Sequence, residues 1–458
     1  MLPLTPARVL RFAAAALLVA CEAGSENDSP TASPPASPPD RPARQDIVTT
    51  DLALDVGTRT GRATLVVRPA ADASEVALDV TGLTVIAVTR DGVEVEADVR
   101  DGLLRVPVPA ASASATIAVE YTFPERTPRT FDGWMPGLGV SFVWPDRCGN
   151  LFPCDPSPVD GVTFTLAVTG QDPSLDVVYA ASTYGDGPSY MPGLAVGDYA
   201  ELDLGVTRAG TRLKAWYFDV AGRKAIAEAG TEHLREGFDF FEQTYGPYHF
   251  GPESGSVEVD WGADSWGGME HHPYSHIATF DMGTEEVHLH EAAHGWFGDA
   301  VRLACWEDFV LSEGTVTYMA ARAAEETGAG DLWVYYVDYF LEPICRGADL
   351  NPIVWPADTC NAIDISTDDI WSLATYMKGA CFYEEVADEV GADVVDAAIA
   401  DMYAAHVGDA ARMEDMVAAL EARVPEGQRD AVTAAADAWL LTEACPEDYA
   451  ARCGAHDW

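Results

Sequence analysis

The sequence His290-Glu291-Ala292-Ala293-His294, followed nineteen residues later by Glu313, constrains this chain more than any other feature. Residues four positions apart lie on one face of a helix, so a helix here directs both imidazoles at one metal ion. Two histidines and a later glutamate are the ligand set of a catalytic zinc site, which keeps a fourth position open. The sequence therefore predicts two helices, over residues 286–297 and 312–326, that meet at one zinc ion per chain.

Glu291 lies beside the first predicted ligand. Its carboxylate is placed to take a proton from water activated by the metal and to pass it to a leaving amine. A chance H-E-x-x-H would be only an ordinary pair of helix histidines. The later Glu313 favours a zinc hydrolase, with His290, His294 and Glu313 as ligands and Glu291 as general base.

The chain is strongly acidic. Its 458 residues contain 74 Asp and Glu against 27 Lys and Arg, a formal net charge of −47. Such a surface repels the phosphates of nucleic acids and of anionic lipids, so binding of either through charge is excluded. With 48% hydrophobic residues, the chain is long enough for two or three domains with substantial cores.

The first twenty residues resemble a bacterial lipoprotein signal peptide. Arg8 and Arg11 precede an apolar run, residues 12–20, that is too short to span a bilayer. The run ends in Leu-Val-Ala before Cys21, where such peptides are cut and the cysteine carries a lipid. We expect residues 21–45, rich in Pro, Ser and Ala, to be a disordered tether of an exported, lipid-anchored protein at the outer membrane or cell surface. An ordinary secretory signal is the alternative.

Eight cysteines follow Cys21, an even number that favours disulfides in an exported protein. Short spacing predicts the first two of the following pairs, and the other two are one choice among many: Cys148–Cys154, Cys445–Cys453, Cys345–Cys360 and Cys305–Cys381. No C-x-x-C spacing occurs, which argues against a second, cysteine-based zinc site.

The pattern of apolar and polar residues changes near residue 210. Short alternating apolar runs separated by turn residues fill residues 46–210 and predict an antiparallel, sandwich-like β-domain. Residues 211–445 are mostly helical in pattern and form a second, α+β domain, and a short tail covers residues 446–458. We expect helices over residues 223–245, 286–297, 312–326, 332–341, 370–390, 394–404, 413–422 and 428–441.

Several motifs resemble those of the aminopeptidase N-like zinc peptidases, a family that includes leukotriene hydrolase. The family's metal helix reads H-E-x-x-H-x-W-F-G-N, and residues 290–299 read HEAAHGWFGD. Its third ligand lies in N-E-G, here SEG at residues 312–314. Its G-G-M-E-N and Tyr-x-Lys-Gly correspond to GGMEH at residues 267–271 and to residues 376–379, and FPCDP at residues 152–156 looks like its FPC-x-D-x-P segment. The resemblance spans residues 46–445 and implies a thermolysin-like catalytic domain after the β-domain.

The resemblance also assigns roles at the substrate. Glu270 binds the free α-amino group of a peptide, which makes the family exopeptidases. The backbone at Gly267, Gly268 and Met269 runs beside the substrate as an added β-strand. Tyr376 donates a hydrogen bond to the oxyanion. The implied activity is a zinc-dependent aminopeptidase acting on peptides outside the cytoplasm, and we expect a monomer.

Three departures from the family pattern leave alternatives open. His271 replaces the asparagine of G-G-M-E-N; contact with substrate and, with His276, a second metal are alternatives to the partly exposed, non-ligand role that we expect. Asp299 replaces the asparagine after W-F-G, so a contact near the metal differs. Many relatives carry a further amine-binding glutamate before the FPC segment, but residues 141–144 hold no carboxylate. The alternative functions are a zinc endopeptidase or other zinc hydrolase, and a non-catalytic surface binding protein.

Overall fold

The structure is a computed structural model that describes most of the chain after residue 44. The described residues are 45–109, 112–127, 132–183, 185–262, 267–347, 352–357, 359–360, 362–365 and 372–454. Residues from Pro42 onward form one compact unit. The predicted signal peptide, the lipidation site Cys21 and nearly all of the tether lie outside the described residues.

The first part of the unit is built from β-strands, as predicted. A six-stranded sheet has the order β11-β1-β2-β8-β4-β5, and its neighbours are antiparallel except for β1 and β11, which pair in parallel. Its strands are β1 (Asp46–Asp55), β2 (Thr60–Arg68), β4 (Thr84–Arg90), β5 (Val93–Glu94), β8 (Ala115–Thr122) and β11 (Thr163–Thr169). Alternate side chains of β8 are buried, which gives the sheet one apolar face.

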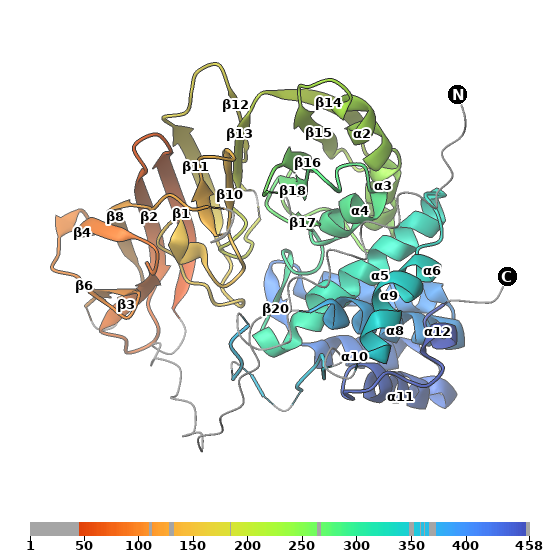
Figure 1. The fold of residues 1–458 in the computed structure, drawn as a ribbon. Helices are drawn as coiled ribbons and strands as arrows, with labels where there is room; N and C mark the ends of the chain where they lie inside the picture. The colour runs from red at the N-terminus through yellow and green to blue at the C-terminus, as the bar shows by residue number, and fades with distance from the viewer. Residues whose placement is uncertain are drawn as a thin grey trace, which may run out of the picture. The chain divides into compact units, whose positions relative to one another are not determined.

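Two smaller sheets complete this β-rich part (Figure 1). One has the order β3-β7-β6, with β3 (Glu75–Asp79), β6 (Asp98–Arg100) and β7 (Leu103–Pro107). The other has the order β12-β13-β10-β9, with β9 (Gly133–Met135), β10 (Val140–Phe142), β12 (Asp176–Tyr179) and β13 (Leu194–Gly197).

A five-stranded sheet begins the catalytic part and crosses the boundary predicted at residue 210. Its order is β14-β15-β16-β18-β17, so β17 lies at one edge. Its strands are β14 (Tyr199–Val206), β15 (Arg212–Phe218), β16 (Glu253–Val259), β17 (Gly268–Met269) and β18 (Tyr274–Ala278). A strand at an edge leaves one row of backbone groups free to pair with another chain.

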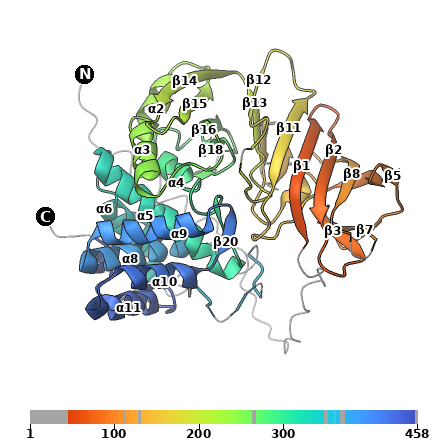
Figure 2. The ribbon, with the colours of Figure 1, turned by 180° about the vertical axis from the view of Figure 1, so that it is seen from behind.

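Helices make up most of the rest, and most of them lie where the sequence pattern predicts a helix (Figure 1 and Figure 2). They are α2 (Arg223–Gly230), α3 (Leu234–Thr244), α4 (Glu285–Ala293), α5 (Phe309–Thr327), α6 (Trp333–Tyr336), α7 (Glu342–Arg346), α8 (Leu373–Val390), α9 (Ala392–His406), α10 (Met413–Arg423), α11 (Arg429–Trp439) and α12 (Tyr449–Arg452). A short parallel pair joins β19 (Val301–Leu303) to β20 (Asp409–Ala411). Among the described residues, no helix has both the length and the apolarity that crossing a bilayer requires.

The single helix predicted over residues 223–245 is wrong, because the chain breaks between α2 and α3. The backbone at Gly230 runs so close to Met282 that a Cβ there would lie 2.2 Å from a carbonyl oxygen. A new helix begins at Leu234, where the preceding His233 N–H donates to the side chain of Glu285 at 3.0 Å. The apolar period continues through the break, so the pattern does not reveal it.

The two metal-site helices also differ from their predicted limits. Helix α4 ends at Ala293, and His294 follows as its C-terminal cap in helical conformation. Helix α5 begins at Phe309, so Ser312 lies inside it. The prediction that this helix begins at Ser312 is therefore wrong by three residues.

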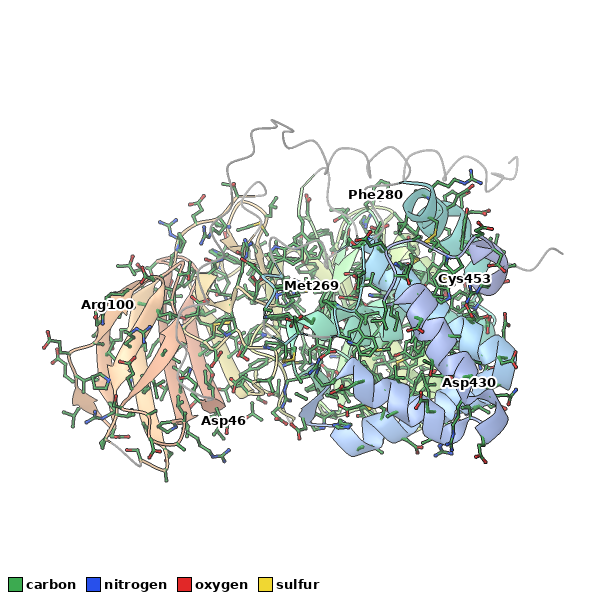
Figure 3. All side chains as sticks on the ribbon, turned by 90° about the horizontal axis from the view of Figure 1, so that it is seen from below. Asp46, Arg100, Met269, Phe280, Asp430 and Cys453 are labelled. Atoms are coloured by element: carbon green, nitrogen blue, oxygen red, sulfur yellow. A yellow bond between two sulfur atoms is a disulfide. The ribbon has the colours of Figure 1, made fainter. Side chains whose placement is uncertain are left out.

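Four disulfides lie among the described residues, and only one matches its predicted partner. Cys148–Cys154 is confirmed. The other three predicted pairs are wrong, since the structure instead joins Cys305–Cys360, Cys345–Cys445 and Cys381–Cys453. Cys445 and Cys453 do not pair because the segment between them includes α12, and each cysteine faces a different helix, α7 or α8 (Figure 3 labels Cys453). The last two bridges fasten the C-terminal tail to the helical core.

Helices α5 and α8 approach each other through two glycines. A Cβ on Gly314 would lie 2.7 Å from the Cα of Gly379, and a Cβ on Gly379 would lie 2.5 Å from the Cα of Gly314. Gly314 follows the predicted ligand Glu313, and Gly379 lies three residues after Tyr376. The contact therefore sets how far the tyrosine stands from the metal site.

Substitution of Gly379 by alanine tests this contact. We expect Gly379→Ala to lower the free energy of unfolding by about 1–3 kcal/mol, because the added methyl group meets backbone atoms that cannot rotate away. Thermal or urea unfolding measures the change. Gly427→Ala is the matched control, since a Cβ at that position meets nothing within 4 Å. Equal stability of the two variants would contradict the proposed role of the contact.

Candidate active site

The three predicted metal ligands lie together in the structure. His290 Nε2 is 3.2 Å from Glu313 Oε2, and His294 Nε2 is 3.4 Å from the same oxygen. One nitrogen or oxygen from each side chain lies within 4.8 Å of the other two, and all three residues are buried. Two helices carry them, because α4 and its cap hold both histidines while α5 packs against α4 and holds the glutamate.

Hydrogen bonds orient both imidazoles. His294 Nδ1 donates to the carbonyl oxygen of Phe297 at 3.1 Å. The hydroxyl of Thr317 donates to the Glu313 carbonyl at 2.7 Å, so its oxygen accepts from His290 Nδ1 at 3.5 Å. A proton on each Nδ1 leaves the lone pair on Nε2, which is the nitrogen that faces Glu313.

The site concentrates negative charge. Burial raises the pKa of Glu313, but His294 and the histidine hydrogen bonds outweigh burial and lower it to about 2. Burial lowers the pKa of His294, yet Glu270 and Glu313 raise it well above its ordinary value. Burial raises the pKa of Glu291 well above its ordinary value, against the charge of His294 and with the help of Glu270.

Glu291 and Glu270 lie on the open side of the metal site. The ligand atoms of Glu270, Glu291 and His294 also fall within 4.8 Å of one another. Gly268 packs directly on Glu291, because a Cβ at Gly268 would lie 2.5 Å from the Glu291 Oε1 atom. The structure thus brings the predicted general base and the predicted amine-binding residue to the same place.

Strand β17 carries the predicted substrate-binding backbone. Among the described residues, Gly268 and Met269 pair only with Ile277 and His276 of β18. Gly267 precedes them with φ +79°, a conformation that favours glycine, and its N–H donates to Asp281 at 2.6 Å. The strand is therefore placed as an edge strand beside the predicted base (Met269 is labelled in Figure 3).

Tyr376 packs against one of the predicted metal ligands. Its ring stacks on His290 with 5.7 Å between ring centroids and 19° between the ring planes. It belongs to α8, whose distance from α5 is set by Gly314 and Gly379. This places the tyrosine beside the predicted ligands, as the motif predicts.

The partly exposed role expected for His271 is wrong. His271 is only 1% exposed, and His272 and His276 are buried as well. Its ring points toward the β-rich part, where Nε2 accepts from the N–H of Val143 at 3.4 Å. Burial, and then the neighbouring His276, lower the pKa of His271 well below its ordinary value. Among the described residues, no group of possible metal ligands includes these three histidines.

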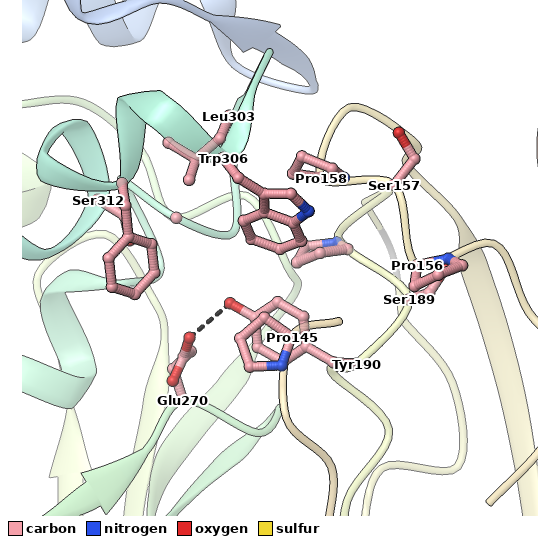
Figure 4. A pocket seen from close by; sticks show the side chains of 13 residues that line it. Pro145, Pro156, Ser157, Pro158, Ser189, Tyr190, Glu270, Leu303, Trp306 and Ser312 are labelled. Carbon is pink, nitrogen blue, oxygen red and sulfur yellow. Dashed lines mark hydrogen bonds between the residues drawn. The ribbon is translucent and has the colours of Figure 1, made fainter. Parts of the chain in front are cut away.

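One further residue of this site, Tyr190, is not predicted by any motif in the sequence. Its hydroxyl donates to Glu270 Oε1 at 2.5 Å and lies 3.4 Å from Asp299 Oδ1. Tyr190 and Glu270 line a small pocket together with proline, leucine, serine and aromatic residues (Figure 4). Tyr190 lies in the loop before β13, far from every motif, and only its tertiary contacts reveal it.

The residues present fit a zinc ion. Two imidazole nitrogens and one carboxylate oxygen are the donor set of an open catalytic zinc site. The ligand atoms of His290, His294 and Glu313 lie close together, and hydrogen bonds at Nδ1 orient both imidazole rings. The buried carboxylates around them favour a cation.

Comparison with known proteins agrees with the motifs. Residues 272–439 match the peptidase family M1 domain. Aminopeptidase B of Rattus norvegicus is 26% identical over 277 residues, which are 53% of this chain and 39% of that protein. Aminopeptidase N of Streptomyces lividans is 25% identical over 255 residues, 51% of this chain and 29% of that protein. The chain spans less than half the length of the curated relatives it matches.

Solved structures share the fold. An M1 zinc metallopeptidase from Deinococcus radiodurans superposes with a TM-score of 0.72 at 20% identity, covering 89% of this chain and 97% of that chain. Native yeast LTA4 hydrolase gives a TM-score of 0.71 at 19% identity, over 88% of this chain and 69% of that chain. The predicted order, a β-domain followed by a mostly helical metallopeptidase domain, is confirmed.

Loss of one ligand tests the metal site. We expect Glu313→Gln to bind zinc far more weakly than the wild type, because the neutral amide loses both the charge and the affinity of the carboxylate for zinc. Elemental analysis after gel filtration measures zinc per chain, with about one expected in the wild type. His406→Ala, at the end of α9, is the control and keeps its zinc. Full zinc content in Glu313→Gln would rule out this ligand set.

Proposed function

We propose that this chain, which carries a peptidase family M1 domain, is a zinc-dependent aminopeptidase that removes N-terminal residues from peptides. One observation carries the proposal. The carboxylate of Glu270 lies within 4.8 Å of both the Glu291 carboxylate and the His294 imidazole. A buried acid at this distance is placed to hold the amino group of the residue whose carbonyl is attacked.

The closeness of Glu270 to Glu291 suits an amino group and a carbonyl group that belong to the same substrate residue. Within an amino acid, the α-amino nitrogen lies roughly 2.5 Å from the carbonyl carbon. A charged hydrogen bond from that nitrogen to a carboxylate adds about 2.8 Å. An ammonium held by Glu270 therefore keeps the carbonyl carbon of the same residue within about 5 Å of the Glu270 carboxylate, in the region that Glu291 and His294 also border.

The chemistry is divided among a few residues. When bound by His290, His294 and Glu313, zinc polarises a peptide carbonyl and makes water more acidic. Glu291 takes a proton from the attacking water and delivers it to the leaving amine. Tyr376 donates a hydrogen bond to the oxyanion that develops.

Substrate orientation comes from backbone and charge. The edge of β17 pairs with an extended peptide, and Gly268 allows close approach because it has no side chain. Glu270 then sets the register from the N-terminus. The names of the relatives, aminopeptidase B and aminopeptidase N, support the same reaction.

Two other functions make different predictions. A zinc endopeptidase on the same site would cleave peptides whether or not their amino group is free. A non-catalytic binding protein would bind peptides without cleaving them. The closeness of Glu270 to Glu291 favours the aminopeptidase, because an endopeptidase has no use for a buried acid at the first residue.

Blocking the amino group distinguishes these functions. We expect N-acetylation of a good aminoacyl chromogenic amide to lower kcat/KM by at least about 100-fold, because the ammonium that pairs with Glu270 is lost. Hydrolysis of matched free and acetylated substrates measures the change. Undiminished cleavage of the acetylated substrate would support the endopeptidase instead.

The variant Glu291→Gln is the inactive control for this experiment. It keeps the size of the side chain but cannot accept a proton, so it is expected to cleave neither substrate. A chelator should abolish wild-type activity, and added zinc should restore it. Peptide binding without cleavage in the wild type would favour the non-catalytic alternative.

We further propose that the protein is exported and anchored by lipid at Cys21. The lipobox-like sequence before Cys21 and four disulfides among the described residues support this, because disulfides persist in oxidising compartments.

Substitution of Cys21 tests the anchor. We expect Cys21→Ser to move the protein from the membrane fraction to the soluble fraction, because the acceptor of the lipid is gone. Fractionation and activity assays measure this, and activity per molecule should not change. An unchanged membrane association would contradict the lipid anchor.

A further inference from the structure

The anchor for the substrate's amino group is only half explained by Glu270. In the proposed function the anchor is a single carboxylate, and residues 141–144 of the β-rich part hold none that could share the role. A glutamate side chain has several rotatable bonds, and fixing it in one conformation costs conformational entropy. Something else must hold Glu270 in place if it is to bind an ammonium well.

Tyr190, a residue of the β-rich part, forms a hydrogen bond with Glu270. Its hydroxyl donates to Glu270 Oε1 at 2.5 Å (the dashed line in Figure 4). Tyr190 is 6% exposed and Glu270 8%. One oxygen of the carboxylate is thereby occupied, which leaves Oε2 to receive the substrate.

The backbone fixes this pair in register. Pro192 and His272 form a parallel bridge, and the His272 N–H donates to the Met191 carbonyl at 3.1 Å. Tyr190 lies two residues before Pro192, and Glu270 lies two residues before His272. A parallel register therefore places Tyr190 opposite Glu270.

The surroundings keep the hydrogen bond strong and correctly directed. Pro145, Trp306 and Phe309 line the same pocket and limit water around the Tyr190 hydroxyl (Figure 4). Burial, and then the charge of Glu270, raise the pKa of Tyr190 well above its ordinary value, so its hydroxyl keeps its proton. Asp299 Oδ1, at 3.4 Å, is the more distant acceptor.

We propose that Tyr190 is a positioning residue of the amino-terminal subsite, whose hydroxyl holds Glu270 in the orientation that binds the ammonium group of the substrate. This inference rests on the proposed aminopeptidase function and adds a residue from outside the catalytic domain. Among the described residues, the hydroxyl of Tyr190 has Glu270 and Asp299 as its partners and forms no hydrogen bond with a predicted metal ligand, so it acts through Glu270.

The variant Tyr190→Phe removes the hydroxyl and keeps the ring. We expect KM for free-amino substrates to rise roughly ten-fold or more, because a hydrogen bond to a charged group is lost. We expect kcat to change by less than about two-fold, because binding of the ammonium contributes equally to ground state and transition state. Steady-state kinetics with an aminoacyl chromogenic amide measures both parameters.

Tyr245→Phe is the matched control. Tyr245 is also buried, and its hydroxyl donates to a buried acid, Asp396, at 2.9 Å, away from the site. Both variants lose one buried hydrogen bond, so both lose a similar amount of stability. Only Tyr190→Phe is expected to change KM.

A second measurement isolates the amino group. Leucinamide and its des-amino analogue, 4-methylpentanamide, are compared as competitive inhibitors of the wild type and both variants. Tyr190→Phe should weaken leucinamide roughly ten-fold and leave the analogue unchanged, because only leucinamide has an ammonium for Glu270. A structural defect would weaken both ligands together.

The outcomes separate this inference from the proposed function. If wild type cleaves free-amino substrates while Tyr190→Phe keeps its KM and its leucinamide preference, the role of Tyr190 is refuted and the aminopeptidase stands. Equal losses in Tyr190→Phe and Tyr245→Phe would also refute it, as a general effect of stability. If the wild type cleaves no free-amino substrate, the proposed function itself fails.

Discussion

The active site depends on negative charge that the protein buries and does not neutralise with its own cationic side chains. Four buried carboxylates surround the two histidines: Glu270, Glu291, Asp299 and Glu313. In the described part of the chain, the charges that most affect the pKa values of Glu291, Asp299 and Glu313 belong to other acids and to histidines. None of these charges belongs to a lysine or an arginine. Buried like charges are costly unless a cation joins them. A divalent metal and the ammonium of a substrate are the two cations that such a site attracts.

The rest of the fold brings these groups together and keeps a path to them. Helices α4 and α5 hold the three ligand atoms, while the contact between Gly314 and Gly379 brings α8 and its Tyr376 to the same place. The five-stranded sheet ends at β17, so an extended backbone has an unpaired edge beside Glu291. Rigid helices therefore carry the reacting groups, and a sheet edge orients what they act on.

The sequence predicted the features that local geometry determines. Helical spacing of His290 and His294 and the motif around Glu313 were sufficient for the metal site, and apolar periodicity was sufficient for most helices. Features set by tertiary contact were not predictable. Three disulfide pairs, the break before Leu234 and the burial of His271 depend on neighbours that are distant in sequence. Tyr190 belongs to the same class, since only a bridge between two loops places it opposite its partner.

The residues that we propose to cleave the peptide bond and the residues that we propose to hold the N-terminus of the substrate lie in different segments of the chain. The family M1 match covers residues 272–439, which include the metal ligands, Glu291 and Tyr376 but neither Glu270 nor Tyr190. The matched domain thus holds the groups that we propose to break a peptide bond. The groups that we propose to set which bond is broken lie before it, on segments that meet at Pro192 and His272. A change in the β-rich part can therefore alter substrate choice while leaving the chemistry intact, because the amine anchor is shared between the two parts.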